Sequence, residues 1–179
     1  IRAWQSFGMT ETVSHIALAP IEEGELVYQA LPGVAIGINE QDCLWIQSPM
    51  SGSEKIQTND TIELRSKNTF AWIGRIDFVV NSGGIKLFPE QLERRIAPLL
   101  EETCPGCAYF LYREKDSRLG EQLVLYVEQT GEEKRRLALE AGLEQFLGKY
   151  EVPKKIYFIA AFAYTPTRKI NRHTTAASL

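Results

Sequence analysis

Cysteine is scarce in this sequence: Cys43, Cys104 and Cys107 are the only three among 179 residues. So few cysteines argue against the disulfide framework of a secreted domain and favour a cytoplasmic protein. The last two have C-x-x-C spacing, but a redox pair normally follows a strand and opens a helix, whereas this pair follows a predicted helix. A zinc site needs two more ligands, and His15 and His173 are distant in sequence. We therefore expect a structural turn.

Long apolar runs and an excess of positive charge are also missing. No run approaches the ~20 residues that a membrane helix needs, and the start lacks the pattern of a signal peptide. The net charge of −3 and the isoelectric point of about 5.5 argue against nucleic acid as a partner, although residues 168–173 include a short basic tail. With 44% hydrophobic and 24% charged residues, the composition is typical of a packed globular protein.

Residues 74–93, GRIDFVVNSGGIKLFPEQLE, carry the densest local pattern. Alternation predicts a strand over 76–80, and the glycines of 81–84 predict a turn with positive φ. A second strand is expected over 85–88, and Pro89 suits the first turn of a helix. A glycine-rich reversal beside charged residues could cradle a ligand; an ordinary hairpin with charged edges is the alternative.

The chain is predicted to divide near residues 74 and 75. Before this point, a β-rich pattern interrupted by Pro and Gly predicts a small barrel-like sheet with short strands over 25–28, 34–36, 44–46 and 61–64. After the hairpin we predict a helix, two strands, a helix and a strand, over 89–102, 109–112, 122–128, 132–150 and 155–162. The second helix is predicted to bury one face, formed by Leu139, Leu143, Phe146, Leu147 and Tyr150.

Three short segments, in order along the chain, resemble motifs of one enzyme superfamily. Residues 6–12, SFGMTET, are similar to its Tyr-Gly-x-Thr-Glu motif, with Phe7 in the aromatic position. Residues 74–77, GRID, are similar to its Gly-Arg-x-Asp hinge motif, and residues 165–172, TPTRKINR, to its Pro-x-Thr-x-x-Gly-Lys motif. The chain thus resembles the acyl-adenylate-forming superfamily, which includes acyl-CoA synthetases, luciferases and peptide-synthetase adenylation domains.

The resemblance implies an α+β fold in two domains. Residues 1–74 would form the β-rich end of a large adenylate-forming domain, and residues 75–179 a small mobile C-terminal domain, with a hinge at Asp77. The superfamily's Ser/Thr/Gly-rich phosphate loop, which precedes the first motif, is not in this sequence, nor is any G-x-x-x-x-G-K-[ST] motif. The chain also opens without an initiator Met. We therefore expect the C-terminal part of a larger enzyme, which makes no acyl-AMP by itself.

The chemistry implied by the resemblance has two steps. A carboxylic acid attacks the α-phosphate of ATP to give acyl-AMP and pyrophosphate, and the thiol of coenzyme A then attacks the acyl carbon and releases AMP. Lys169 is the candidate cation for the first step, because an ammonium group on a loop can reach both the carboxylate and the α-phosphate. The alternative is a solvated lysine in a basic tail beside Arg168 and Arg172.

The first motif would contact the nucleotide. The resemblance implies that Glu11 holds Mg²⁺ against ATP and that Thr10 binds a phosphate oxygen. Gly8 and Met9 are assigned to the same nucleotide site. The alternative for this segment is a helix N-terminus, with Thr10 or Thr12 as the cap and the acidic side chain facing the helix dipole.

Two further groups of residues complete the implied site. Asp60 resembles the aspartate that accepts hydrogen bonds from the ribose hydroxyls, and Arg75 resembles the ribose-contacting arginine. Their alternatives are a turn aspartate and a surface ion pair. Gly83 and Gly84 fall where the superfamily lets the pantetheine arm of coenzyme A pass close to the backbone.

The sequence departs from the superfamily pattern at three positions. Arg168 stands where the superfamily usually has glycine before its lysine, and glycine permits backbone angles that arginine disfavours. Asn59 replaces the glycine before the ribose-binding aspartate. Asn81 occupies a position that is often lysine.

Within the superfamily, residues 8–12 and 81–90 are most similar to the o-succinylbenzoate–CoA ligases of menaquinone synthesis. Ser14 and His15 follow the first motif, on a segment that the superfamily places beside the acid pocket. Both side chains can donate hydrogen bonds, which would suit a substrate with a second carboxylate. The alternatives are a fatty or aryl acyl-CoA synthetase, and a non-catalytic binding module.

Overall fold

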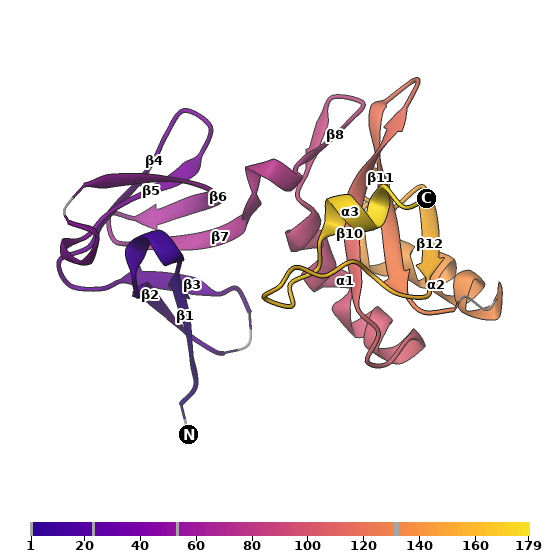
Figure 1. The fold of residues 1–179 in the computed structure, drawn as a ribbon, viewed down its shortest axis with the longest axis horizontal. Helices are drawn as coiled ribbons and strands as arrows, with labels where there is room; N and C mark the ends of the chain where they lie inside the picture. Colours follow the sequence, from indigo (N-terminus) through magenta and orange to yellow (C-terminus); the bar gives the residue numbers. More distant parts are fainter. Residues whose placement is uncertain (1, 23, 53, 131–132) are drawn as a thin grey trace. The chain divides into compact units, whose positions relative to one another are not determined.

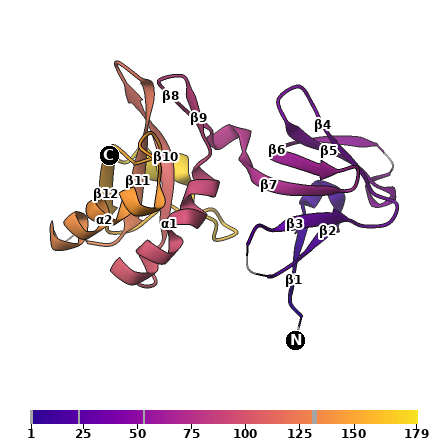
Figure 2. The same ribbon diagram turned by 180° about the vertical axis from the view of Figure 1, so that it is seen from behind.

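The structure is a computed structural model that describes residues 2–22, 24–52, 54–130 and 133–179 (Figures 1 and 2). The chain forms two compact units, Ile1–Asp77 and Phe78–Leu179. This division lies three residues beyond the sequence-based boundary at Gly74. The first unit is built on a sheet, and the second combines a sheet with helices. The predicted α+β class is confirmed. None of the described helices is long and apolar enough to cross a membrane.

The first unit is one antiparallel sheet of seven strands in the order β1-β2-β3-β7-β6-β5-β4. Short 3₁₀ turns, η1 (Thr10–Thr12) and η2 (Pro49–Ser51), interrupt the chain. Strands β1, β2 and β7 were not predicted from the sequence, whereas β3, β4, β5 and β6 overlap the predicted positions. The strands are β1 (Trp4–Gly8), β2 (His15–Pro20), β3 (Val27–Ala30), β4 (Ala35–Ile38), β5 (Cys43–Gln47), β6 (Lys55–Ser66) and β7 (Thr69–Arg75).

The core of the first unit shows that this sheet is curled. Ile16 on β2 and Ile36 on β4 belong to one buried cluster with Phe70, although the described residues of this unit form only short 3₁₀ turns and no α-helix that could cover a face of the sheet. The sheet must therefore bend around its core, as the barrel-like prediction required. The barrel is not closed, because within the described residues no pairing joins β1 to β4.

The second unit has a five-stranded sheet in which β10, β11, β8 and β9 follow one another and β12 pairs in parallel with β11. A 3₁₀ turn, η3 (Ile76–Phe78), leads into it. The elements are β8 (Val80–Ser82), β9 (Ile85–Leu87), α1 (Pro89–Thr103), β10 (Tyr109–Asp116), β11 (Gly120–Glu128), α2 (Glu133–Phe146), β12 (Lys155–Ile159) and α3 (Arg172–Ala176).

Both faces of this second sheet are covered. Helices α1 and α2 lie on one face, in front in Figure 2, and the C-terminal segment with α3 lies on the other, in front in Figure 1. Strand alternation divides the side chains accordingly: Leu111 packs into the helical core, whereas Phe110 and Tyr112 pack into the second core with Phe162. Phe110 and Tyr126 stack there with ring centroids 4.8 Å apart.

The predicted strand over residues 76–80 is wrong. Residues Ile76–Phe78 form a 3₁₀ turn, and β8 begins only at Val80. The turn is held by side chains: Arg75 Nη2 lies 2.6 Å from Asp77 Oδ2, and Asn59 Nδ2 donates to Asp77 Oδ1 at 3.0 Å. The local Arg75–Asp77 contact and the tertiary Asn59–Asp77 bond together override the alternation pattern.

The second predicted helix is shorter than predicted, and the ends of three strands differ from their predicted bounds. Helix α2 ends at Phe146, and Tyr150 is 63% exposed rather than buried. The chain turns at this point because the Gly148 N–H donates to Glu151 Oε2 at 2.7 Å. The predicted start at residue 132 lies outside the described residues. Strand β10 continues to Asp116 and β11 begins at Gly120, beyond the predicted bounds 109–112 and 122–128, and β12 ends at Ile159 instead of 162.

The C-x-x-C pair forms the expected turn between α1 and β10. The Cys107 N–H donates to Cys104 O at 3.1 Å, and the Cys107 thiol donates to Gln129 Oε1 at 3.2 Å. Burial raises the pKa of the Cys104 thiol. A reactive thiol needs the opposite shift, so the geometry and the chemistry both favour a structural role.

We expect Tyr126→Phe to reduce the loss of stability in alkali. Burial raises the pKa of Tyr126 to about 12, above the ordinary tyrosine value of about 10. Its stabilising contribution is therefore complete below pH ~10 and is lost as the pH rises through ~12. The measurement is the urea midpoint against pH over this window, with the exposed Tyr150→Phe as the control. Equal alkaline losses in wild type and Tyr126→Phe would contradict the prediction.

Candidate functional site

In the first unit, strand pairing brings two of the predicted ribose-binding residues together. Asp60 on β6 lies opposite Arg75 on β7 in the antiparallel register. Asp60 is only 8% exposed and accepts a hydrogen bond from the indole Nε1 of Trp72 at 2.8 Å. Its backbone N–H donates to Thr58 Oγ1 at 3.0 Å. The aspartate therefore lies within a strand, and the turn alternative is wrong.

Arg75 and the predicted hinge residue share an ion pair. Arg75 Nη2 lies 2.6 Å from Asp77 Oδ2, with each side chain about two-fifths exposed (41% and 43%). The surface ion pair offered as the alternative for Arg75 is thus present. Asn59, which replaces the superfamily glycine, donates to both carboxylate oxygens of Asp77 at 3.0 and 3.2 Å. The departure at Asn59 therefore adds a bond that holds Asp77 against β6.

The first motif forms the sharp connection between β1 and β2. A Cβ added at Gly8 would lie 2.7 Å from both the Cα of His15 and the carbonyl oxygen of Ser14, so only glycine fits this irregular register. Thr12 is fully buried and supplies the local cap: its hydroxyl accepts from the Met9 N–H at 3.1 Å. Thr10 and Glu11, the predicted phosphate and Mg²⁺ contacts, are exposed.

The predicted acid-binding residues follow directly. Ser14 and His15 are exposed where β2 begins, and Ser14 Oγ lies 3.2 Å from His15 Nδ1. The two side chains therefore form one polar pair that faces solvent in the described structure. A carboxylate could bind both groups at once.

The two glycines of the β8–β9 turn have the predicted backbone conformation. Gly83 has φ +57° and Gly84 has φ +85°, both in the region that favours glycine. A Cβ at Gly83 would lie 3.1 Å from Leu119 Cδ2, whereas Gly84 has open space beside it. A ligand could therefore approach the backbone at Gly84 directly.

The third motif is a tight loop closed by an isolated bridge between Tyr164 and Ile170. Inside it, the Thr165 N–H donates to Lys169 O at 2.8 Å, and the Arg168 N–H donates to Thr165 O at 2.9 Å. Arg168 has φ +60°. Arginine thus adopts the left-handed conformation that glycine would take without strain, and the exposed Lys169 follows on a well-bonded turn.

Arg168→Gly is expected to raise the free energy of unfolding by about 0.5–1 kcal/mol. The left-handed conformation costs a non-glycine residue roughly 1–2 kcal/mol, and the greater freedom of glycine in the unfolded chain offsets part of the gain. Chemical denaturation measures the change. Thr167→Gly, one residue earlier without positive φ, is the control and should destabilise. A destabilised Arg168→Gly would contradict the strain argument.

Sequence reasoning missed the residues that hold these groups in place. Trp72 orients Asp60, and Glu93 on α1 forms a buried ion pair with Arg172 at 2.9 Å. Arg172 had been interpreted only as part of a basic tail, and no partner had been predicted for Glu93. These partners are 79 residues apart, and a single sequence carries no signal that pairs them.

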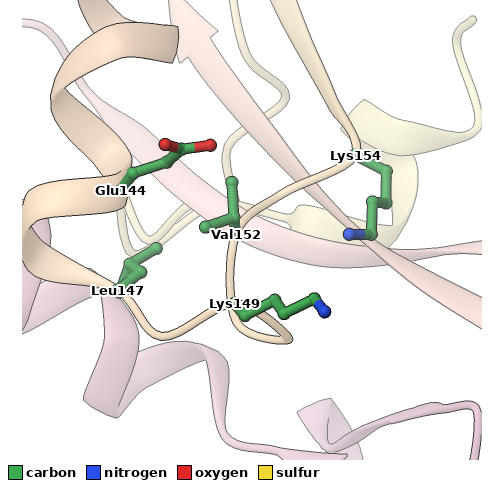
Figure 3. A pocket seen from close by; sticks show the side chains of 5 residues that line it. All are labelled: Glu144, Leu147, Lys149, Val152 and Lys154. Atoms are coloured by element: carbon green, nitrogen blue, oxygen red, sulfur yellow. The ribbon is translucent and has the colours of Figure 1, made fainter.

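The second unit contains a cavity of about 380 Å³ (Figure 3). It lies between the end of α2 and the connection to β12. None of the predicted site residues lines it. Its lining side chains are Glu144, Leu147, Lys149, Val152 and Lys154.

Metal binding was also predicted at Glu11. Within the described ranges, no group of three or more His, Cys, Asp or Glu side chains could hold a metal ion. Mg²⁺ in nucleotide sites, however, is commonly held by one or two carboxylates together with substrate phosphates and water. A single exposed carboxylate fits that mode of binding.

Comparisons with known proteins place these features in context. No model of a known protein family matches the chain. The acyl-CoA synthetase ALT10 of Alternaria alternata is 30% identical over 117 residues, which are 63% of this chain and 20% of that protein. A solved structure of an AMP-forming acyl-CoA synthetase/AMP-acid ligase II-like protein from Dyadobacter fermentans is 41% identical and covers 99% of this chain and 51% of that one, with a TM-score of 0.57.

The fold is also shared with more distant structures. The o-succinylbenzoate CoA synthetase of Bacillus subtilis, solved with its acyl-adenylate intermediate, has a TM-score of 0.79 at 18% identity and covers 97% of this chain and 40% of that one. The chain therefore spans about half or less of each protein that it matches here.

Proposed function

Because this chain belongs to the acyl-adenylate-forming superfamily and matches its C-terminal portion, we propose that it is part of an AMP-forming acyl-CoA ligase. The reaction is acid plus ATP plus coenzyme A to acyl-CoA, AMP and pyrophosphate. One observation carries the proposal: Lys169 lies on a turn that is closed by backbone hydrogen bonds, and the preceding residue, Arg168, adopts the left-handed conformation although it is not glycine. A disordered basic tail would have no reason to hold a strained conformation.

Two residues of the second unit serve the two steps: Lys169 supplies a positive charge for the first, and Gly84 leaves room for coenzyme A in the second. In the first step a carboxylate oxygen attacks the α-phosphorus and pyrophosphate leaves, while the Lys169 ammonium stabilises the negative charge on the transferring group. In the second step the thiol sulfur bonds to the acyl carbon, loses its proton, and AMP leaves. The open backbone at Gly84 lets the pantetheine arm approach.

The residues of the first unit bind the nucleotide. Asp60, oriented by Trp72, accepts hydrogen bonds from the ribose hydroxyls, and Arg75 donates to the same sugar. Gly8 and Met9 belong to the same proposed nucleotide site, and Thr10 donates to a phosphate oxygen. Glu11 is the residue that would hold Mg²⁺, which neutralises phosphate charge when bound. Asp77 serves as the hinge position between the units.

The substrate proposed is a dicarboxylate, o-succinylbenzoate, which would place the protein in menaquinone synthesis in the cytoplasm. The polar pair of Ser14 and His15 supports this choice, because both side chains can donate hydrogen bonds to a second carboxylate. The test is kcat/KM of the complete enzyme for o-succinylbenzoate, long fatty acids and simple aryl acids. We expect the dicarboxylate to be favoured by 10-fold or more, as about 1.4 kcal/mol of hydrogen bonding would give. A preference for a fatty acid would overturn the substrate while leaving the ligase proposal intact.

The 179-residue chain alone should show no ATP–pyrophosphate exchange, since the phosphate loop and most of the acid pocket are absent from this sequence. The rival proposal is a binding module without catalytic activity. The complete protein decides between them: exchange with an acid supports the ligase, and binding of nucleotide without exchange for any acid supports the module.

A further inference from the structure

One ion pair of the second unit, between Arg172 and Glu93, has no role in the chemistry proposed above. Arg172 Nη1 lies 2.9 Å from Glu93 Oε1, and Arg172 Nη2 donates to Glu93 Oε2, also at 2.9 Å. Each side chain is only 15% exposed. Glu93 belongs to α1, and Arg172 is the first residue of α3, three positions after Lys169. The pair therefore links a helix to the end of the lysine loop.

The pair also wraps around the edge strand β10. The Leu111 N–H donates to Glu93 Oε1 at 2.7 Å, and Arg172 Nη1 donates to Leu111 O at 3.2 Å. The guanidinium carbon lies 4.7 Å from the ring centre of Phe78 and 5.8 Å from that of Phe110. Helices α1 and α3 lie on opposite faces of the sheet (Figures 1 and 2), so this one contact joins both layers to the strand between them.

A second anchor holds the other end of the loop. The Phe162 N–H donates to Glu128 Oε1 at 2.7 Å, and the Tyr164 hydroxyl donates to Glu128 Oε2 at 2.5 Å. The loop is thus fixed by Glu128 where the chain enters and by Glu93 with Arg172 where it leaves. Lys169 lies between the two anchors.

The energetics favour a geometric role for the ion pair. Burial raises the pKa of the Glu93 carboxyl, although the Arg172 charge and the Leu111 N–H both act in the opposite direction. In largely buried ion pairs the cost of desolvation offsets much of the attraction, so such a pair is weak evidence for stability. A planar guanidinium that binds two carboxylate oxygens does fix distance and orientation.

We propose that Glu93 and Arg172 are positioning residues, which fix the place of the Lys169 ammonium for the adenylation step. This inference rests on the function proposed for Lys169. In the complete enzyme, Arg172→Lys and Glu93→Gln should each slow pyrophosphate exchange roughly 10- to 100-fold, as a misplaced catalytic group does. The thioester step from supplied acyl-AMP should be unchanged. Arg95→Lys is the matched control, since Arg95 pairs with Glu151 at 2.8 Å from the same helix and should leave both steps unchanged.

A double variant tests whether the pair acts through the lysine. If it does, Lys169→Ala with Arg172→Lys should be no slower in exchange than Lys169→Ala alone. Independent, multiplying losses would overturn the inference. Normal exchange in Lys169→Ala would instead refute the proposed function. A large loss in Lys169→Ala with normal exchange in Glu93→Gln and Arg172→Lys would refute only the positioning role.

Amide hydrogen exchange gives a readout without activity. In the 179-residue chain, Glu93→Gln should raise the exchange rate of the Lys169 and Asn171 amides, which bond to Thr165 Oγ1 and Ala163 O, roughly tenfold through local opening. The amide of Leu125, in the central strand β11, should keep its wild-type rate. Equal acceleration at all three amides would mean that the pair supports the whole unit, and no acceleration at the loop would mean that it does not hold the loop; either result overturns the inference.

Discussion

Lys169→Ala in the complete enzyme is expected to slow acyl-AMP formation by about 10²–10³-fold, or about 2.7–4 kcal/mol, the effect of removing one preorganised donor from a charged transition state. Lys169 is exposed and its loop is held by backbone bonds and the Thr165 hydroxyl, so the substitution should leave the fold intact. The measurement is acid-dependent ATP–pyrophosphate exchange.

Two controls separate charge from position. Lys154→Ala removes another exposed lysine of the same unit, in the cavity of Figure 3, and should leave exchange unchanged. Lys169→Arg keeps the charge but changes its shape, and should lie between wild type and alanine. If Lys169→Ala exchanges at the wild-type rate, the lysine is a solvated surface residue, as the alternative interpretation held.

The second large effect is expected at the β8–β9 turn. Gly84→Leu should slow thioester formation from supplied acyl-AMP by roughly 10²-fold, because a side chain would fill the open space through which the thiol approaches. Pyrophosphate exchange should remain near normal. Gly84→Leu is thus expected to slow the second step and spare the first, whereas Lys169→Ala should slow the first. The two half-reactions are assayed separately.

Gly84→Leu introduces backbone strain as well as a side chain, so a second variant must measure the effect of strain alone. Gly106 has φ +72°, close to the φ +85° of Gly84, and it too has open space beside it, in the turn of the C-x-x-C pair. Gly106→Leu therefore carries a similar conformational cost away from the proposed site. Equal losses of the thioester step in the two variants would show that strain, and not obstruction, is responsible.

Local signals explain which elements the sequence predicted well. The β8–β9 turn and the start of α1 were placed correctly because Gly83, Gly84 and Pro89 have strong individual preferences. Strand β2 was missed because its buried positions do not alternate regularly: Ile16 and Ala17 are both fully buried. Strand β1 was missed because none of its residues is buried.

Long-range bonds explain the failures. The strand predicted over residues 76–80 is a 3₁₀ turn because Asn59, 18 residues away, binds Asp77. In the candidate site, the sequence motifs indicated the buried Asp60 and the more exposed Arg75 and Lys169. The motifs could not indicate Trp72 and Glu93, which hold these groups in place, because such contacts depend on which distant segments the fold brings together.

The two covered faces of the second sheet have a consequence for the order of folding. Strands β10 and β11 can pair early, since they are joined by a short turn. One of their faces, however, is buried only when Phe162, Ile170 and Ala176 arrive from the far end of the chain. During synthesis on the ribosome, the Phe110–Tyr126 stack therefore stays solvent-accessible until almost all of this unit has emerged from the exit tunnel. The nascent strand pair is at that stage a target for chaperones and for aggregation.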